Sequence, residues 1–355
     1  MRHTFPQTDK RRAELRLIAT EEAWSIPEVA EELRKTANSP TQSLDKLLVK
    51  GIYDAPSDTS GYGKLDFLSG LKDIEEHRLP QMDEFGVDMH LLALTAPGVQ
   101  MFDADTAMEL ASLANDRLAE VCRKYPTRFA GLASFAPHSP KRAAKEMERA
   151  INDLGLNGFM INSHTNGEYL DDPKFWPILE AAEALDRCIY IHPRAASDTL
   201  KGPLQDYGMD SAMWGYGVEV GTHAVRMMAG GVFDHFPKLK ICIGHMGEAV
   251  PFWLWRINFM NSRAQVVGRA KKTGRSMAEY FQDNFVITTS GVEDPLALRY
   301  AIDKLGVQNV MWAIDYPYQP MKPAVDFIEA FECTEEERHA LCHGNAERIF
   351  HIDPA

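Results

Sequence analysis

The amino-acid sequence predicts an α/β fold, a parallel (β/α)8 barrel, from three observations. Short apolar runs recur eight times, and each run is closed by polar or turn residues. Between them lie segments in which apolar residues return every three or four positions, as in amphipathic helices. No G-x-G-x-x-G turn follows the first run, which disfavours the alternative of an open, doubly wound sheet with a dinucleotide site. The chain of 355 residues is therefore expected to form one barrel domain, 1–355, with loop insertions.

The eight apolar runs are the expected strands of the barrel. In chain order they are LRLIATEE (15–22), VDMHLLALTAP (87–97), RFAGLASFAP (128–137), LNGFMINSH (156–164), RCIYIHP (187–193), LKICIGHMGE (239–248), NFVITTSG (284–291) and NVMWAIDYP (309–317). Their nearly continuous apolar character predicts strands that are buried on both faces, as in parallel sheets. Helical periodicity is clear over 104–125, 141–155 and 175–186.

Two stretches depart from the repeat of strand and helix. Residues 36–70 are polar and rich in Gly, Ser and Pro, and residues 194–217 contain MDSAMWGYG. Both leave the C-terminal end of an expected strand, which is the end of a barrel that carries active sites, so we expect lids or pocket walls. Tolerated insertions or subunit contacts are the alternative, and the aromatic content of 194–217 favours a pocket or an interface.

The charge of the chain excludes two classes of partner. There are 38 basic and 51 acidic residues, a formal net charge of −13, whereas nucleic acids and anionic membranes attract clusters of Lys and Arg. No apolar run approaches the ~18 residues of a membrane span, and the first residues lack the apolar stretch of a signal peptide. A cytoplasmic protein without a nucleic-acid or membrane partner is expected.

The cysteines point to no site of their own. The five are scattered without C-x-x-C spacing, which predicts neither a disulfide framework nor a thiolate zinc site. Cys188 and Cys242 lie within expected strands and are expected to be small buried side chains.

Metal-binding side chains recur where the expected strands end. Strand one ends in Glu21, strand five in His192 and strand eight in Asp315, while Asn162 and His164 end strand four and His245 ends strand six. A single histidine of this kind is more often a hydrogen-bonded structural residue. Because a barrel gathers its strand ends around one mouth, Glu21, His192 and Asp315 together predict a metal site. Two carboxylates and one imidazole without a thiolate favour Mn²⁺, with Zn²⁺ as the alternative.

The motifs ATEEAW, LTAPGVQ, INSHT, YIHPR, IGHMGEA, PFWLWRI, ITTSG and AIDYPY resemble those of a known family. They are similar to the nonoxidative aromatic-acid decarboxylases of the amidohydrolase superfamily, which act on 5-carboxyvanillate, γ-resorcylate and 2,3-dihydroxybenzoate. The resemblance extends from about residue 16 to residue 352 and looks closest to the 5-carboxyvanillate enzymes. It implies a distorted barrel, one divalent metal at Glu21, His192 and Asp315, no organic cofactor, and a homodimer or homotetramer. Ala23 stands where relatives carry a further histidine, and Glu22 is expected to form a structural pair with a basic residue.

The reaction that the resemblance implies begins with protonation of the ring. Loss of CO2 from an aromatic ring without prior protonation would leave an unstable aryl carbanion. A hydroxyl ortho to the carboxylate can chelate the metal together with one carboxylate oxygen, and an acid can then protonate the carbon between them. Asp315 is the expected acid. A metal-dependent hydrolase of a lactone or an amide, with Asp315 as the base, remains the alternative.

Further site residues are expected around this centre. His245 and Glu248 are expected to form an acid–base dyad if a helix begins at His245, although a capping Glu beside a structural His is the alternative. Arg256 matches a family arginine that contacts the substrate or the catalytic Asp, with a surface salt bridge as the alternative. The arginine that 5-carboxyvanillate enzymes carry after the first strand is missing, and Arg194 or Lys64 could replace it. Loop aromatics that could enclose a small aromatic acid are Trp214, Tyr216 and Tyr318, with Phe102 beside them.

Overall fold

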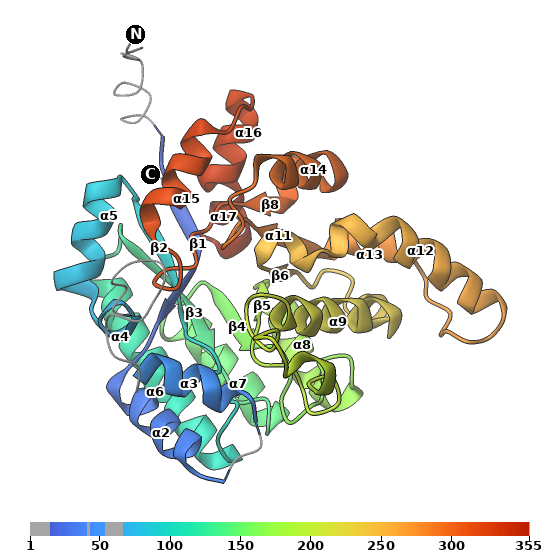
Figure 1. Ribbon diagram of the computed structural model, residues 1–355, viewed down its shortest axis with the longest axis horizontal. Helices are drawn as coiled ribbons and strands as arrows, with labels where there is room; N and C mark the ends of the chain where they lie inside the picture. Colours follow the sequence, from blue (N-terminus) through green and yellow to red (C-terminus); the bar gives the residue numbers. More distant parts are fainter. Residues whose placement is uncertain (1–14, 41–42, 54–66, 355) are drawn as a thin grey trace.

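Eight parallel strands form a nearly closed barrel surrounded by helices, as the sequence predicts (Figure 1). The computed structural model describes residues 15–40, 43–53 and 67–354. The strands follow one another around the sheet in chain order. They are β1 (Ile18–Trp24), β2 (Met89–Leu94), β3 (Phe129–Ser134), β4 (Gly158–Asn162), β5 (Ile189–His192), β6 (Ile241–Ile243), β7 (Phe285–Thr288) and β8 (Val310–Met311).

Helices connect the strands on the outside of the barrel. Those before β4 are α2 (Pro27–Asn38), α3 (Asp45–Tyr53), α4 (Phe67–Lys72), η1 (Ile74–Arg78), α5 (Leu79–Phe85), α6 (Ala104–Lys124) and α7 (Pro140–Asn152). Between β4 and β7 lie η2 (Pro173–Phe175), α8 (Trp176–Ala184), η3 (Gly202–Leu204), α9 (Gly215–Ala229), α10 (Val232–His235), α11 (His245–Glu248), α12 (Val250–Val266) and α13 (Met277–Asn284). The last are α14 (Pro295–Leu305), η4 (Val307–Asn309), α15 (Met321–Ala330), α16 (Glu335–His339), η5 (Ala340–Gly344) and α17 (Asn345–Phe350).

The barrel closes irregularly between β8 and β1. The regular ladder of β8 covers only two residues, and beyond it the Ala23 N–H donates to the Tyr316 carbonyl over 2.7 Å. The Thr20 hydroxyl donates to the Trp312 carbonyl over 2.8 Å. Side chains of β1 therefore replace part of the backbone ladder, which accounts for the distortion of the barrel.

The hydrophobic core has two layers on either side of the strands. One layer fills the barrel with alternate strand residues such as Ile18, Leu132 and Cys242, and α17 covers its N-terminal end with Phe350. The larger layer packs the other strand faces against the helices. Continuous apolar strands are thus buried on both faces, as predicted, and Cys188, directly before β5, and Cys242, on β6, are buried within the first layer.

The two insertions have different structures. In the part of 36–70 that is described, α2 ends at Asn38, α3 follows, and α4 starts at Phe67. Residues 194–217 form a loop with the short η3 before α9 begins at Gly215. None of the helices in the described part of the chain is long and apolar enough to cross a membrane. The α12 helix projects away from the barrel as an arm (Figure 1).

Candidate metal centre

Three strand ends bring Glu21, His192 and Asp315 together at one point of the barrel. One ligand atom from each lies within 4.8 Å of the other two, and His192 Nε2 is 3.5 Å from Glu21 Oε1. Ligands at 2.0–2.2 Å from one cation lie at most about 4.4 Å apart, so small side-chain rotations would complete a shared site. The three side chains fit a single divalent cation.

Glu21 supports this fit because its two oxygens have different surroundings. The Oε2 atom accepts hydrogen bonds from the hydroxyls of Tyr190, Thr288 and Ser290. The Oε1 atom is buried and has no hydrogen-bond partner among the described residues. A buried carboxylate oxygen without a partner is costly, and a cation would compensate for it.

His192 presents the nitrogen that a metal needs. Its Nδ1 lies 2.7 Å from the Pro193 carbonyl and 3.1 Å from Asn162 Oδ1, both of which are acceptors. The Nδ1 atom therefore carries the proton, which leaves the lone pair of Nε2 directed toward Glu21. Asn162, one of the polar residues at the end of β4, thus orients the imidazole.

Asp315 lies in a strained turn after β8. Its backbone φ is 77°, a left-handed conformation that few non-glycine residues adopt. Burial raises the pKa of the Asp315 carboxyl, the negative charge of Glu21 adds to the shift, and His245 opposes it. His245 Nε2 is 3.8 Å from Asp315 Oδ2, close enough for charge attraction but too far for a hydrogen bond.

His245 and Glu248 are in contact, as the sequence predicts, but through a different backbone. His245 Nδ1 lies 2.7 Å from Glu248 Oε1. Both residues have positive φ, 49° and 51°, as do the residues between them, so a left-handed turn replaces the expected start of a helix. Burial lowers the pKa of His245, but the negative charges of Glu248, Glu21 and Asp315 outweigh it and raise the pKa well above 6.5.

Glu22 points away from the metal centre and binds backbone rather than a basic side chain. Its carboxylate accepts hydrogen bonds of 3.0 Å from the N–H groups of Ile314 and Tyr316. His90 Nδ1 is 3.9 Å away, and the Arg78 charge also attracts the carboxylate. Burial raises the pKa of Glu22 to about 8 and outweighs these favourable interactions.

Arg194 is buried in an ion pair rather than free in the pocket. Its Nη2 lies 2.5 Å from Asp45 Oδ2, and its Nη1 donates to the His164 carbonyl over 3.1 Å. The Ala195 N–H donates to the other Asp45 oxygen over 3.0 Å. This pair joins the first turn of α3 to the loop after β5, and the charge of Arg194 is neutralised there.

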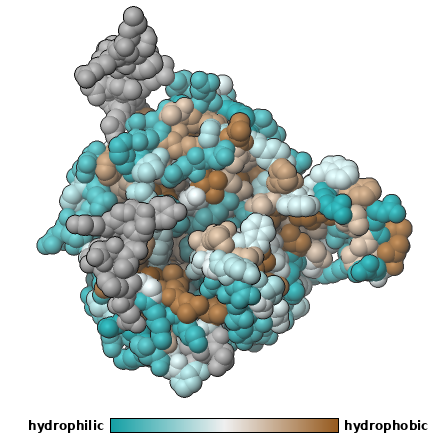
Figure 2. Space-filling model, in the orientation of Figure 1, coloured by the Kyte–Doolittle hydropathy of each residue, from teal (hydrophilic) through white to brown (hydrophobic). Residues whose placement is uncertain are grey.

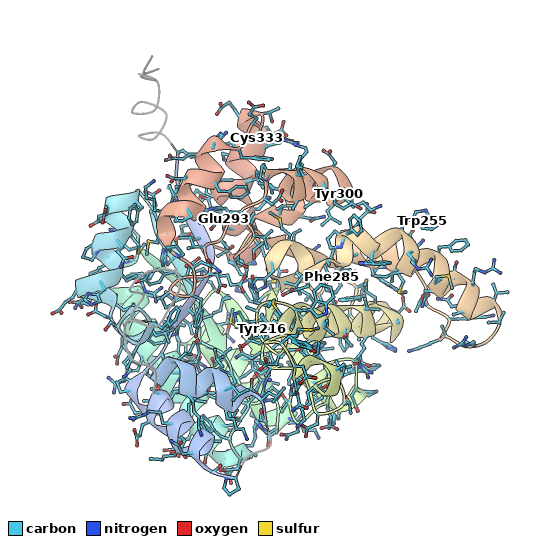
Figure 3. All side chains as sticks on the ribbon, viewed as in Figure 1. Tyr216, Trp255, Phe285, Glu293, Tyr300 and Cys333 are labelled. Atoms are coloured by element: carbon cyan, nitrogen blue, oxygen red, sulfur yellow. The ribbon has the colours of Figure 1, made fainter. Side chains whose placement is uncertain are left out.

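The other expected site residues lie in varied places. Tyr216 is at the start of α9, near the middle of Figure 3, and burial and the nearby Asp45 raise the pKa of its hydroxyl. The Tyr318 hydroxyl is 2.5 Å from Thr95 Oγ1. Trp214 is 56 % exposed, and Arg256 is exposed on the α12 arm. Lys64 lies outside the described residues.

His164 and Phe102 are structural in this arrangement. The Gly167 N–H donates to His164 Nδ1, so His164 Nε2 carries the proton and donates to the Ala195 carbonyl over 3.1 Å. Phe102 belongs to the larger core layer. His164 therefore ties the loop after β4 to the loop after β5.

Sequence reasoning missed the hydroxyl groups around Glu21 and the role of Asp45. The motif ITTSG contains Thr288 and Ser290, and in the sequence it indicates only the family. Its position at the end of β7 was the available signal, because that end faces the same mouth as Glu21. Asp45 carried no comparable signal in the sequence.

The chain is similar to known proteins along most of its length. A family model described as amidohydrolase matches residues 70–352. A γ-resorcylate decarboxylase from a Polaromonas species is 35% identical over 296 residues, which cover 80% of this chain and 90% of that protein.

Two crystal structures share the fold along nearly the whole chain. One is 5-carboxyvanillate decarboxylase from Sphingomonas paucimobilis, with TM-score 0.92, 53% identity, and coverage of 96% of this chain and 100% of that one. The other is 5-carboxyvanillate decarboxylase from Novosphingobium aromaticivorans, complexed with manganese and 4-hydroxy-3-methoxy-5-nitrobenzoic acid. Its TM-score is 0.91 and its identity 36%, with 95% of this chain and 96% of that one covered.

Proposed function

The chain belongs to the amidohydrolase family, and from this premise we propose that it is a metal-dependent, nonoxidative decarboxylase of aromatic acids with a hydroxyl ortho to the carboxylate. A 5-carboxyvanillate-like acid is the proposed substrate, with γ-resorcylate or 2,3-dihydroxybenzoate as the alternative. The observation that carries the proposal is the convergence of Glu21, His192 and Asp315 around one buried, unpartnered carboxylate oxygen. Manganese, found in a structural relative, is the proposed metal, with zinc as the alternative.

The charges of the site require a cation. Glu21, Asp315 and Glu248 are three carboxyl groups close to a single charged imidazole, that of His245. A divalent cation held by Glu21, His192 and Asp315 would supply a Lewis acid that keeps the ortho hydroxyl of the substrate as a phenolate. The substrate brings at least one further negative charge, so neutralisation at this point also favours its binding.

Asp315 is the proposed proton donor to the ring. Burial and the negative charge of Glu21 raise its pKa, and this direction favours the protonated form that a proton donor needs. Asp315 transfers this proton to the ring carbon that bears the carboxylate; the bond to the carboxylate then breaks, its electrons restore the aromatic ring, and CO2 leaves. His245, charged, 3.8 Å from Asp315 and held by Glu248, is the proposed group that returns a proton to Asp315 after the ring has been protonated.

The relative that binds 4-hydroxy-3-methoxy-5-nitrobenzoic acid supports this class of substrate. The nitro group of that acid lies ortho to the hydroxyl and is planar with two oxygens, like a carboxylate. Tyr216 and Tyr318 are the proposed aromatic neighbours of the substrate ring, since Tyr216 is at the start of α9, directly after the long loop that follows β5, and Tyr318 lies in the loop after β8. Trp214 remains a prediction.

The two arginines have different proposed roles. Arg194 is neutralised by Asp45, so we propose that it holds the loop after β5 in place rather than binding a carboxylate. Arg256 remains a proposed substrate contact. In a single chain Arg256 is exposed on α12, so another subunit would have to cover it.

The proposed function is tested by supplying Mn²⁺ and following CO2 release and ultraviolet absorbance with 5-carboxyvanillate, γ-resorcylate, 2,3-dihydroxybenzoate and salicylate. Release of CO2 without oxygen or an organic cofactor is expected for at least one of them. Hydrolysis of a lactone or an amide without any CO2 release would replace the decarboxylase by the hydrolase alternative. Indifference to chelators would contradict both.

We also propose that the chain forms a homodimer or homotetramer through the α12 arm. The arm and the adjoining α14 expose large apolar side chains: Phe252 (72 %), Trp253, Trp255 (67 %), Phe259, Met260, Leu296 and Tyr300. Figure 2 shows hydrophobic surface along this arm, and Figure 3 places Trp255 on it. Apolar patches of this kind mark association surfaces.

A second copy of the chain is the partner that the charges favour. Two arginines and no acidic residue lie on α12, while the whole chain has a formal charge of −13. A Trp255→Glu variant is expected to give a lower mass than the wild type in light scattering after size exclusion, whereas Tyr207→Glu, on an exposed loop, is the control. Equal masses for the wild type and Trp255→Glu would contradict the arm interface. The cytoplasmic location remains a prediction.

A further inference from the structure

We propose that Tyr190, Thr288 and Ser290, together with Gly244, form a cradle that commits one oxygen of Glu21 to the protein and leaves the other for the cation. The inference rests on the metal site of the proposed function and adds four positioning residues to it. All three hydroxyl groups contact Glu21 Oε2, and no described residue donates a hydrogen bond to Oε1. The difference in hydrogen bonding between the two oxygens of Glu21 is therefore produced by side chains from β5 and the end of β7.

The donors can be assigned by counting protons. The His245 backbone N–H donates to Ser290 Oγ over 3.1 Å, so the proton of Ser290 is available for Glu21 Oε2. Tyr190 donates its proton to the same oxygen. Thr288 Oγ1 lies 2.8 Å from the Tyr190 hydroxyl, 3.1 Å from Ser290 Oγ and 3.1 Å from Glu21 Oε2, and so links the group.

Ser290 also couples the metal ligand to the acid–base turn. Its hydroxyl accepts a hydrogen bond from the backbone N–H of His245 and donates one to Glu21. The Ser290 side chain therefore fixes the distance between His245 and Glu21. His245 Nε2 is 4.0 Å from Glu21 Oε1. A shift of Glu21 would therefore change both the proposed coordination of the cation and the surroundings of the proposed proton carrier.

Gly244 closes the fourth side of the cradle by having no side chain. A Cβ atom at this position would lie 2.5 Å from Glu21 Oε2, 3.0 Å from Oε1 and 2.9 Å from Ser290 Oγ. The backbone φ of −78° is one that alanine adopts readily, so the obstacle is steric contact with the Glu21 carboxylate and with Ser290 Oγ. The glycine is thus required by Glu21 rather than by the turn.

The cradle predicts binding of the cation through one oxygen of Glu21. An oxygen that already accepts two or three hydrogen bonds has no free lone pair, so bidentate coordination is excluded. Hydrogen-bonding partners of metal ligands commonly change metal affinity by about 10- to 100-fold when they are removed. The same size of effect is expected for each hydroxyl here.

The test measures the Mn²⁺ dissociation constant of the full-length protein by electron paramagnetic resonance, together with the thermal unfolding midpoint. Tyr190→Phe and Ser290→Ala are expected to bind Mn²⁺ about 10- to 100-fold more weakly than the wild type. Tyr280→Phe is the matched control, because Tyr280 is also a buried tyrosine that donates to a carboxylate, that of Asp234, outside the metal centre. It is expected to lower the unfolding midpoint and leave Mn²⁺ affinity unchanged.

Gly244→Ala provides a third cradle variant, and it removes no hydrogen-bonding group. A folded Gly244→Ala protein with Mn²⁺ affinity as weak as that of Tyr190→Phe supports the cradle. Wild-type affinity in all three variants, or an equal loss in Tyr280→Phe, overturns it. A wild-type protein that binds Mn²⁺ at Glu21 but releases no CO2 would refute the proposed function and leave the cradle intact.

Discussion

Glu22 on β1 holds Asp315 from behind, by accepting hydrogen bonds from the N–H groups of the two residues that flank it, Ile314 and Tyr316. Glu21, the neighbour of Glu22 in the chain, faces Asp315 from the metal side. Adjacent carboxylates on one strand thus perform two tasks, because successive strand residues point to opposite faces. One carboxylate is a proposed metal ligand, and the other fixes the left-handed turn that carries the proposed acid.

The free energy of unfolding is expected to depend on pH through Glu22. The folded-state pKa of about 8 lies above the usual value of 4.5, so the native protein keeps a proton that the unfolded chain releases. The contribution of Glu22 to stability is therefore lost as pH rises from about 4.5 to about 8. Glu22→Gln lacks this pH-dependent loss of stability. The urea midpoint of the variant minus that of the wild type should therefore be higher at pH 8 than at pH 5. A relative midpoint that stays constant or falls would contradict the assignment.

Asp315→Asn is expected to abolish turnover and leave part of the metal affinity. The amide oxygen can still face a cation, but the side chain has no acidic proton for the ring carbon. Steady-state CO2 release and Mn²⁺ content of the purified variant are the measurements. Rates like those of the wild type would remove Asp315 from its proposed role.

Glu248→Gln is expected to lower kcat by about 10²-fold or more, because general acid–base groups contribute on that scale. The negative charge of Glu248 raises the pKa of His245, so its removal lowers that pKa. If protonated His245 is the active form, the basic limb of the pH profile of kcat moves to lower pH. Bound Mn²⁺ should not change. An unchanged pH profile of kcat would show that His245 and Glu248 have only a structural role.

Asp45→Asn is expected to destabilise the protein by roughly 3–5 kcal/mol, the usual cost of leaving one member of a buried ion pair alone. Asp45 and Arg194 are both buried. Burial raises the pKa of Asp45, but Arg194 outweighs it and holds the pKa below its usual value. The exposed pair of Asp105 and Arg142 provides the control, and Asp105→Asn should leave the unfolding midpoint unchanged. A small effect of Asp45→Asn would show that the loop after β5 is held by other contacts.

Most of the fold could be predicted because its signals are local. Each strand is an apolar run closed by polar residues, and strand ends meet at one mouth in any barrel, so the convergence of Glu21, His192 and Asp315 followed from position alone. The short ladder of β8 could not be predicted, because it depends on side chains of β1 that bind the chain after Met311.

The contacts that complete the site could not be predicted because they are long-range and chemically ordinary. Asp45 and Arg194 are 149 residues apart, and neither lies in a periodic pattern that would pair them. Thr288 and Ser290 resemble the residues of any turn. The left-handed turn from His245 to Glu248 also differs from the helical start that a spacing of three residues suggests, although both backbones bring the two side chains together.

The most direct test of the metal site is a crystal structure of the protein grown with Mn²⁺, with anomalous diffraction recorded at the manganese absorption edge. We expect a single strong anomalous peak, at a manganese ion bound by Glu21 Oε1, His192 Nε2 and an Asp315 oxygen. Glu21 Oε2 should face Tyr190. A peak at other residues, or none in crystals of protein that releases CO2, would contradict the account.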